Sequence, residues 1–398
     1  MRNLRLTRLR LLILLASLAF IPASLMGQNF VYVNNNIPSA NTVSGFSVST
    51  SGALTPLTGS AFPTGGSGGG IYTFAAVNEL ALSPDGAFLF AANAGSKNVS
   101  VFSINKATGA LTLVGSPVPT GGNDCDGISL AEAVTTSGQF LYAANTCSSN
   151  ITVFSVASDG TLTAVGSPVS LPSNPDGINV RPDGQFLAVA LPFFPNKVAV
   201  FNIGPGGVLT AVPGSPFAAG GSGLETGVDY KCGSKILFGG EDNSSGTIVD
   251  VFDVASNGAL GAIPGSPFTF GSGTALNSNV VLFSPFSQLL FVSNQFSGTV
   301  SDFTVAHDGS LPVNLGARFS DGTSFPAGMA VGSVVTNPIT GASTTFLYVV
   351  NAFSNNVAVF SVADGGDLTL VTASPFSTGQ GGVPVSVVAY PPLGCRVK

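Results

Sequence analysis

The stretch that decides the fold is Phe140-Leu-Tyr-Ala-Ala-Asn145, followed by Ile151-Thr-Val-Phe-Ser-Val156 and, after an Asp-Gly turn, by Thr161-Leu-Thr-Ala-Val165. Apolar and polar residues alternate in these segments, and turn-forming residues separate them, which is typical of short antiparallel strands. The same phrase occurs seven times, at intervals of 47 to 57 residues. Its central phenylalanines are Phe46, Phe102, Phe154, Phe201, Phe252, Phe303 and Phe360. A period of this length predicts a repeat architecture.

Each repeat holds four short strands and closes on a segment of the type Gly214-Ser-Pro-Phe217, which predicts one blade of a propeller. We label the strands A to D from the central channel outward. Strand A is expected at roughly residues 76–83, 128–134, 177–181, 226–230, 279–284, 328–335 and 384–390. Gly, Pro and β-branched residues recur too often for helices. The predicted fold class is therefore all-β, a seven-bladed β-propeller of four-stranded antiparallel blades.

The two ends of the chain predict how the ring closes. The strand Phe30-Val-Tyr-Val33 has no strand A before it, whereas Val383 to Tyr390 forms a surplus strand A after the seventh repeat. We therefore expect the C-terminal strand to join the N-terminal blade, which removes exposed sheet edges. Residues 28–398 are expected to form this single domain, with the recurrent phenylalanines packed between blades.

Residues 1–27 have the pattern of a secretory signal peptide. Arg2, Arg5, Arg8 and Arg10 precede an apolar stretch, and small residues follow it up to Gly27. We expect cleavage near Gln28 and a secreted or periplasmic protein with no stable membrane insertion afterwards. An uncleaved membrane anchor is the alternative interpretation of the same segment.

The chain carries few charges, 13 Lys and Arg against 19 Asp and Glu in 398 residues. Without residues 1–27, nine basic residues remain and the net charge is −10. An acidic surface makes nucleic acid a poor partner. Mean hydropathy is positive, but Gly, Ser, Asn and Pro interrupt every apolar run after residue 26, so no span of about 18 apolar residues is present. We expect a monomer that needs no cofactor.

The four cysteines belong to a chain that is predicted to reach an oxidising compartment, where disulfides persist. The turn of one A–B hairpin is expected around residues 135–138, and Cys125 and Cys147 should face each other at the opposite end of that hairpin. This predicts a disulfide between them. Cys232 and Cys395 follow A–B turns of the fifth and first blades, too far apart in a ring for a bond to be expected. Their state is left open.

The repeated phrase, as in Phe346-Leu-Tyr-Val-Val-Asn351 with Val357-Ala-Val-Phe-Ser-Val362, resembles the YVTN-type repeat. Together with the turns Pro84-Asp-Gly86 and Pro182-Asp-Gly184, it is similar to the lactonase-type seven-bladed propellers. That family includes 6-phosphogluconolactonase-like and muconate-lactonising proteins. The resemblance implies the propeller fold and a lactonase activity.

The residues needed for the family's chemistry are sparse. The single histidine, His307, lies in a predicted C–D turn, on the face opposite the B–C and D–A loops, so a catalytic histidine in the channel is not expected. A phosphorylated lactone would need Arg or Lys at its phosphate. Only Lys97, Lys197 and Arg318 map toward the face that carries the B–C and D–A loops, which we call the upper face, and none is on an inner strand. Whether the protein is an enzyme is therefore left open.

Acidic residues gather on or near this upper face, and we take them as the candidate ligand-binding residues: Glu79, Asp126, Asp176, Glu225 and Glu241. They could bind a cation through carboxylate oxygens, although no compact metal-binding motif is present, or a sugar, with Asp176 or Glu225 as a general base. The alternative is that they only stabilise turns.

The leading hypothesis from the sequence is an exported binding or interaction module that takes carbohydrate or protein on its upper face. The alternative is a lactone hydrolase that uses upper-face carboxylates. A purely structural cell-surface module is the third possibility.

Overall fold

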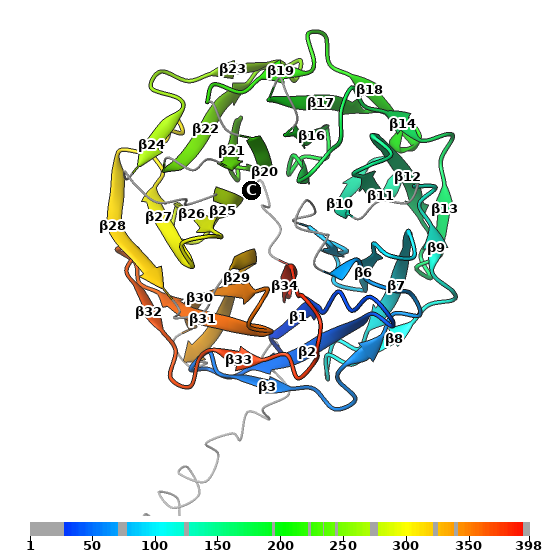
Figure 1. Ribbon diagram of the computed structural model, residues 1–398, viewed down its shortest axis with the longest axis vertical. Helices are drawn as coiled ribbons and strands as arrows, with labels where there is room; N and C mark the ends of the chain where they lie inside the picture. Colours follow the sequence, from blue (N-terminus) through cyan, green and yellow to red (C-terminus); the bar gives the residue numbers. More distant parts are fainter. Residues whose placement is uncertain are drawn as a thin grey trace, which may run out of the picture.

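The computed structural model describes residues 28–70, 78–122, 127–192, 196–221, 224–233, 235–242, 246–270, 278–320, 325–337 and 341–392. In these ranges the chain forms seven antiparallel sheets around a central channel (Figure 1). The predicted fold class is confirmed. The predicted signal segment, residues 1–27, lies outside the described residues, so it stays a prediction.

Strand A faces the channel in every sheet, and strands B, C and D follow outward. Blade 1 contains β34 (Ser386–Tyr390), β1 (Phe30–Asn34), β2 (Thr42–Val48), β3 (Leu54–Pro56) and β4 (Phe62–Pro63). Blade 2 contains β5 (Leu80–Leu82), β6 (Phe88–Asn93), β7 (Asn98–Ile104), β8 (Leu111–Leu113) and β9 (Val118–Pro119). Blade 3 contains β10 (Ile128–Thr135), β11 (Gly138–Asn145), β12 (Asn150–Val156), β13 (Leu162–Ala164) and β14 (Val169–Ser170).

The other four blades repeat this order. Blade 4 contains β15 (Ile178–Val180), β16 (Phe186–Leu191), β17 (Lys197–Ile203), β18 (Leu209–Ala211) and β19 (Phe217–Ala218). Blade 5 contains β20 (Leu224–Tyr230), β21 (Ile236–Asp242), β22 (Thr247–Val254), β23 (Leu260–Ala262) and β24 (Phe268–Phe270). Blade 6 contains β25 (Ser278–Ser284), β26 (Leu289–Asn294), β27 (Thr299–Thr304) and β28 (Val313–Ser320). Blade 7 contains β29 (Pro326–Asn337), β30 (Ala342–Asn351), β31 (Asn356–Val362), β32 (Leu368–Leu370) and β33 (Phe376–Ser377).

Most blades have a fifth strand that the sequence analysis did not separate from strand D. It is the exit segment of the repeat, which pairs with the start of strand C, as β14 does with β12. Within the described residues, helix is limited to 3-10 structure at Gly70 and at Pro205–Gly207, and no helix there is long and apolar enough to cross a membrane.

The ring closes as predicted. β34 pairs with β1 in an antiparallel register that runs from Phe30 opposite Tyr390 to Asn34 opposite Ser386. In Figure 1 the last strand therefore lies as the innermost strand of the first blade. The β1 edge, which would otherwise be open, is covered by the C-terminal strand.

The seven recurrent phenylalanines are buried, with exposed fractions of 6% or less. They pack into the hydrophobic clusters that join neighbouring blades; Phe154, for example, packs with Phe90 of the preceding blade. Burial of each ring stabilises the fold by about 1.5–3 kcal/mol. Their prediction as core residues is confirmed.

A glycine in each C–D turn lets a large side chain of the neighbouring blade pack against the turn. Gly160 has φ +88°, and a Cβ there would lie 2.6 Å from the Phe88 ring of the preceding blade. Gly52 has φ +83°, and a Cβ there would lie 2.4 Å from Phe346, across the ring closure. Glycine is thus needed for its positive φ and for the close approach of the neighbouring ring.

Candidate functional site

A cavity of about 810 Å³ lies in the central channel. Its described lining comes from the strand A of all seven blades and reaches the A–B turns at Pro84, Pro182 and Pro285. Most of its lining side chains are apolar, but polar atoms provide nearly as much of its surface as apolar atoms do. The cavity therefore extends toward the A–B turns, on the face opposite the one that the sequence analysis favoured for ligand binding.

One position of strand A faces this cavity in every blade. At this position the strand A residue pairs with a central residue of strand B, as Asp229 pairs with Phe238. In blade order, the residues at this position are Val388, Ala81, Ala131, Asn179, Asp229, Leu282 and Ala330. All seven line the cavity. Five of them are apolar, so the adjacent pair Asn179 and Asp229 gives the ring a single polar sector.

Asp229 is held by both neighbouring inner strands. Asn179 Nδ2 of β15 donates to Asp229 Oδ1 at 3.1 Å, and the Phe283 backbone N–H of β25 donates to Asp229 Oδ2 at 2.7 Å. Burial raises the pKa of Asp229 to about 7, although the N–H groups of Phe283 and Tyr230 oppose this rise. A carboxyl with a pKa near neutrality and a fixed orientation is suited to general-base catalysis.

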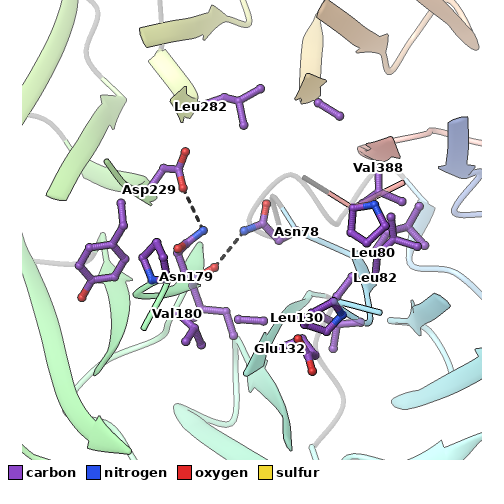
Figure 2. Close-up of a pocket in the computed structure, with 18 of the residues that line it drawn as sticks. Asn78, Leu80, Leu82, Leu130, Glu132, Asn179, Val180, Asp229, Leu282 and Val388 are labelled. Atoms are coloured by element: carbon purple, nitrogen blue, oxygen red, sulfur yellow. Dashed lines mark hydrogen bonds between the residues drawn. The ribbon is translucent and has the colours of Figure 1, made fainter. Parts of the chain in front are cut away.

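Two side-chain amides accompany this carboxyl. Asn78 Nδ2 donates to the Ile178 carbonyl oxygen at 3.0 Å, so Asn78 reaches across to blade 4, next to Asn179. Figure 2 shows Asp229 and Asn179 at one side of the cavity and Asn78 projecting toward them, with these hydrogen bonds as dashed lines. An amide NH2 group has two N–H donors. Each asparagine uses one N–H in the bond just described and has a second N–H that can hold a ligand oxygen.

Glu132, on β10, is the second carboxyl in the cavity lining. Burial is the largest cause that raises its pKa to about 8, and the Asp85 charge adds to the rise, whereas a hydrogen bond with Gln139 opposes it. Glu132 Oε1 is buried and has no hydrogen-bond partner. At neutral pH this carboxyl is therefore mainly protonated and uncharged.

We expect Glu132→Gln to raise stability above neutral pH. Between the ordinary pKa of a glutamate and about 8, the folded state binds more protons than the unfolded state, so the free energy of unfolding falls as pH rises through this window. At pH 8 the glutamine variant should melt a few degrees above the wild type, and its melting temperature should fall less between pH 5 and pH 8. Thermal melts across this pH range test the prediction, with Asp253→Asn, an exposed carboxyl on β22, as the control. A decline equal to that of the wild type would contradict it.

Arg181 is the basic side chain among the described lining residues, and it is already engaged. Its Nε donates to Asp183 Oδ1 at 2.9 Å, and its Nη2 lies 2.6 Å from Asp183 Oδ2. The guanidinium also lies 4.3 Å from the centre of the Phe186 ring. This geometry neutralises Arg181 inside the protein and leaves it poorly placed to bind a phosphate group.

The predicted ligand-binding residue Glu79 is fully buried between blades 1 and 2. Asn34 Nδ2 donates to its Oε2 at 2.9 Å, and Oε1 has no hydrogen-bond partner. Burial raises the pKa of Glu79 well above its usual range. Glu79 does not line the central cavity.

The other predicted residues lie around blades 4 and 5. Asp176 is 2% exposed, and burial, with a smaller contribution from the Asp242 charge, raises its pKa. Glu241 is fully buried and accepts a hydrogen bond from Asn196 Nδ2 at 3.1 Å. Glu225 is paired in register with Glu241 across β20 and β21.

Asp126 lies outside the described residues. The structure thus brings Asp176, Glu241 and the Glu225 backbone to one region and leaves Glu79 apart. None of these residues is in the described lining of the cavity, and their role in ligand binding stays a prediction. In the described part of the chain, no group of three metal-binding side chains is close enough to hold an ion.

His307 occupies the C–D turn of blade 6, between β27 and β28, and is exposed, as predicted. Cys147 and Cys232 both take part in disulfides. Cys125 and Cys395 lie outside the described residues, so the Cys125–Cys147 pairing stays a prediction. Cys232 is not a free thiol, and its partner is not assigned.

The ring of seven four- or five-stranded sheets around a common channel defines the class of the protein, a seven-bladed β-propeller. Residues 25–126 and 127–212 match the family described as lactonase, 7-bladed beta-propeller. The matched stretches cover a little under half of the chain, and they support the resemblance to lactonase-type propellers noted from its repeats.

A curated protein is similar to part of the chain. A stretch of 78 residues is 44% identical to a 6-phosphogluconolactonase of Formosa agariphila, and the match spans 19% of this chain and 21% of that protein. The chain therefore matches about a fifth of the length of this relative.

Two solved structures share the fold over nearly their whole length. A protein of Bacteroides fragilis, provisionally named a 6-phosphogluconolactonase, has a TM-score of 0.70 at 21% identity, covering 92% of this chain and 99% of its own. A periplasmic gluconolactonase of Pseudomonas aeruginosa has a TM-score of 0.70 at 18% identity, covering 91% and 98%. At these identities the likeness establishes the shared fold alone.

Proposed function

We propose that this protein is a lactone hydrolase that opens a sugar lactone in its central cavity. The observation that carries the proposal is the hydrogen-bonded polar sector formed by Asp229, Asn179 and Asn78 in the lining of the central cavity. The lactonase-type family match and the names of the similar proteins support the same reaction class. The site differs from the one predicted from the sequence, because it lies in the channel and not among the upper-face loops.

In this mechanism Asp229 acts as the general base. Its carboxylate takes a proton from a water molecule, and the water oxygen attacks the lactone carbonyl carbon. The spare N–H groups of Asn78 and Asn179 hold the negatively charged carbonyl oxygen of the tetrahedral intermediate. As the intermediate collapses, the ring C–O bond breaks and the leaving oxygen receives the proton from Asp229. The product is the open hydroxy acid, and Asp229 is again ionised.

The same geometry favours an unphosphorylated lactone. The cationic side chain in the described lining, Arg181, is bound to Asp183, so a phosphate group would enter the cavity without an unpaired partner there. Burying a phosphate without an unpaired cationic partner is costly.

We expect kcat/KM for D-glucono-1,5-lactone to exceed that for its 6-phosphate by at least about tenfold, a difference of about 1.4 kcal/mol in transition-state binding. Acid release from a panel of sugar lactones at constant pH measures both. A preference for the phosphorylated lactone would refute this substrate assignment, and the absence of turnover across the panel would refute the proposed function itself.

The binding-module hypothesis for the upper-face acids receives no support from the comparisons, which favour the hydrolase. The predicted signal peptide, if it directs export, would place the reaction outside the cytoplasm. Ligand binding by the upper-face acids and export by the signal peptide both stay proposals, and the lactone assay does not depend on either.

A further inference from the structure

Three phenylalanines form a partly exposed cluster on the upper face, which we call the aromatic platform: Phe296, Phe325 and Phe353. The Phe296 and Phe325 ring centres lie 5.5 Å apart in an edge-to-face arrangement. The Phe325 and Phe353 ring centres lie 4.8 Å apart with tilted planes. Phe325 is 7% exposed, whereas Phe296 is 60% and Phe353 is 51% exposed. The buried central ring therefore supports two rings that face solvent.

The two exposed rings occupy the same position in adjacent repeats. Each lies two residues after the asparagine that ends strand B, Asn294 in blade 6 and Asn351 in blade 7. Phe325 comes from the D–A connection between these blades, and its carbonyl oxygen accepts the Ala352 backbone N–H at 3.0 Å. Phe325 also has φ +74°, a strained conformation for a bulky residue. The fold thus places all three rings on one side of the propeller.

The size of the platform indicates the size of its ligand. Two phenylalanines exposed to about half their surface present about 200 Å² of apolar area. A stable protein–protein interface needs about 800 Å² on each partner. The platform is too small for such an interface but matches one or two rings of a small ligand.

The chemistry around the platform indicates the kind of ligand. Neither B–C loop, residues 295–298 or 352–355, contains a charged residue, so the loops offer no attraction to an anionic membrane surface. Gln295 is 7% exposed, and its Nε2 is buried without a hydrogen-bond partner. The Oδ1 atom of Asn355 is also buried without a hydrogen-bond partner. These atoms supply a donor and an acceptor in the loops that hold Phe296 and Phe353. A hydroxyl group can pair with both, because it donates and accepts.

We infer that the aromatic platform binds a neutral carbohydrate chain. The C–H face of a pyranose ring carries a slight positive charge and stacks on the negative face of an aromatic ring. The sugar hydroxyl groups then pair with the Gln295 and Asn355 amides once these side chains rotate toward the ligand. This binding site is separate from Asp229 and does not depend on the proposed hydrolase.

The test is titration calorimetry of the full chain with neutral pentaoses of glucose, xylose and N-acetylglucosamine in their common linkages. We expect at least one to bind, and Phe296→Ala or Phe353→Ala to weaken its binding by at least about fivefold. The matched control is Phe286→Ala, because Phe286 is 46% exposed but lies in an A–B turn on the opposite face. It should bind the pentaose as the wild type does.

Each other outcome overturns the inference. These are no binding by any pentaose, equal binding by the Phe296 and Phe353 variants and the wild type, or an equal loss in the Phe286 variant. Binding to phosphatidylcholine vesicles that disappears in the Phe296 and Phe353 variants would assign the platform to a membrane surface instead. Melting curves of each variant separate lost binding from lost folding. Lactone turnover, where it is found, should be unchanged in all three variants.

Discussion

Asp229→Asn should lower kcat/KM for lactone hydrolysis by at least about 100-fold while the protein stays folded. Asparagine has nearly the same shape, and it can still accept the Phe283 backbone N–H, but it cannot take a proton from water. The wild-type activity should rise with pH through about 7, the pKa of Asp229, because only the ionised carboxylate is a base. Turnover of a sugar lactone from pH 5 to 9 measures both effects, and the asparagine variant should lose this pH dependence.

Asp302→Asn is the matched control for this experiment. Asp302 is also a buried carboxyl whose pKa is raised to about 7, chiefly by burial, but it lies on β27 and does not line the cavity. Its variant should retain wild-type turnover. If Asp176→Asn or Glu225→Gln abolished turnover while Asp229→Asn did not, the active site would lie on the upper face, as first predicted from the sequence.

The positions of the blades and the closure of the ring could be predicted from the sequence, because both follow from the repeated pattern. The spacing of the phenylalanines from Phe46 to Phe360 located the blades, because the same packing problem is solved seven times with the same residue type. The surplus strand ending at Tyr390 predicted the ring closure for a related reason, since a repeat that lacks strand A must receive one. Both predictions rest on a pattern that spans about 50 residues in each repeat. A local irregularity, such as the register shift between β27 and β28, therefore does not change them.

The candidate site depends on single residues that depart from the repeat, and this is why the sequence analysis missed it. The acidic residues of the loops, such as Asp176, attracted attention because loops carry many functional residues. Asp229 lies within a strand, and its importance appears only when it is compared with Ala81, Ala131 and Leu282 at the same register. That comparison was possible from the repeats alone, and it would have separated Asn179 and Asp229 from the apolar residues around them. The hydrogen bond between these two side chains could not be foreseen, because it joins different blades.

Removal of residues 383–398 should destabilise the whole propeller. This change deletes β34, whose five residues pair with β1. It also removes buried side chains that pack between blades, among them Val385 at 2% and Val387 at 4% exposure. Burial of each valine is worth about 1.5 kcal/mol or more, and a folded protein has only about 5–15 kcal/mol in total. The deletion also uncovers the backbone N–H and C=O groups of β1, which invites aggregation.

We expect the chain that ends at residue 382 to be insoluble or to melt at least about 10 °C below the wild type. The control is a chain that ends at Pro392, which keeps all of β34 and therefore keeps the ring closed. Both should be compared in reducing buffer, so that the loss of Cys395 has no separate effect. If the chain ending at residue 382 melted with the control, β34 would be dispensable, and the closure between β1 and β34 would contribute little to the stability of the ring. If both truncated chains were equally unstable, the stabilising contacts would come from residues after 392 and not from the closing strand.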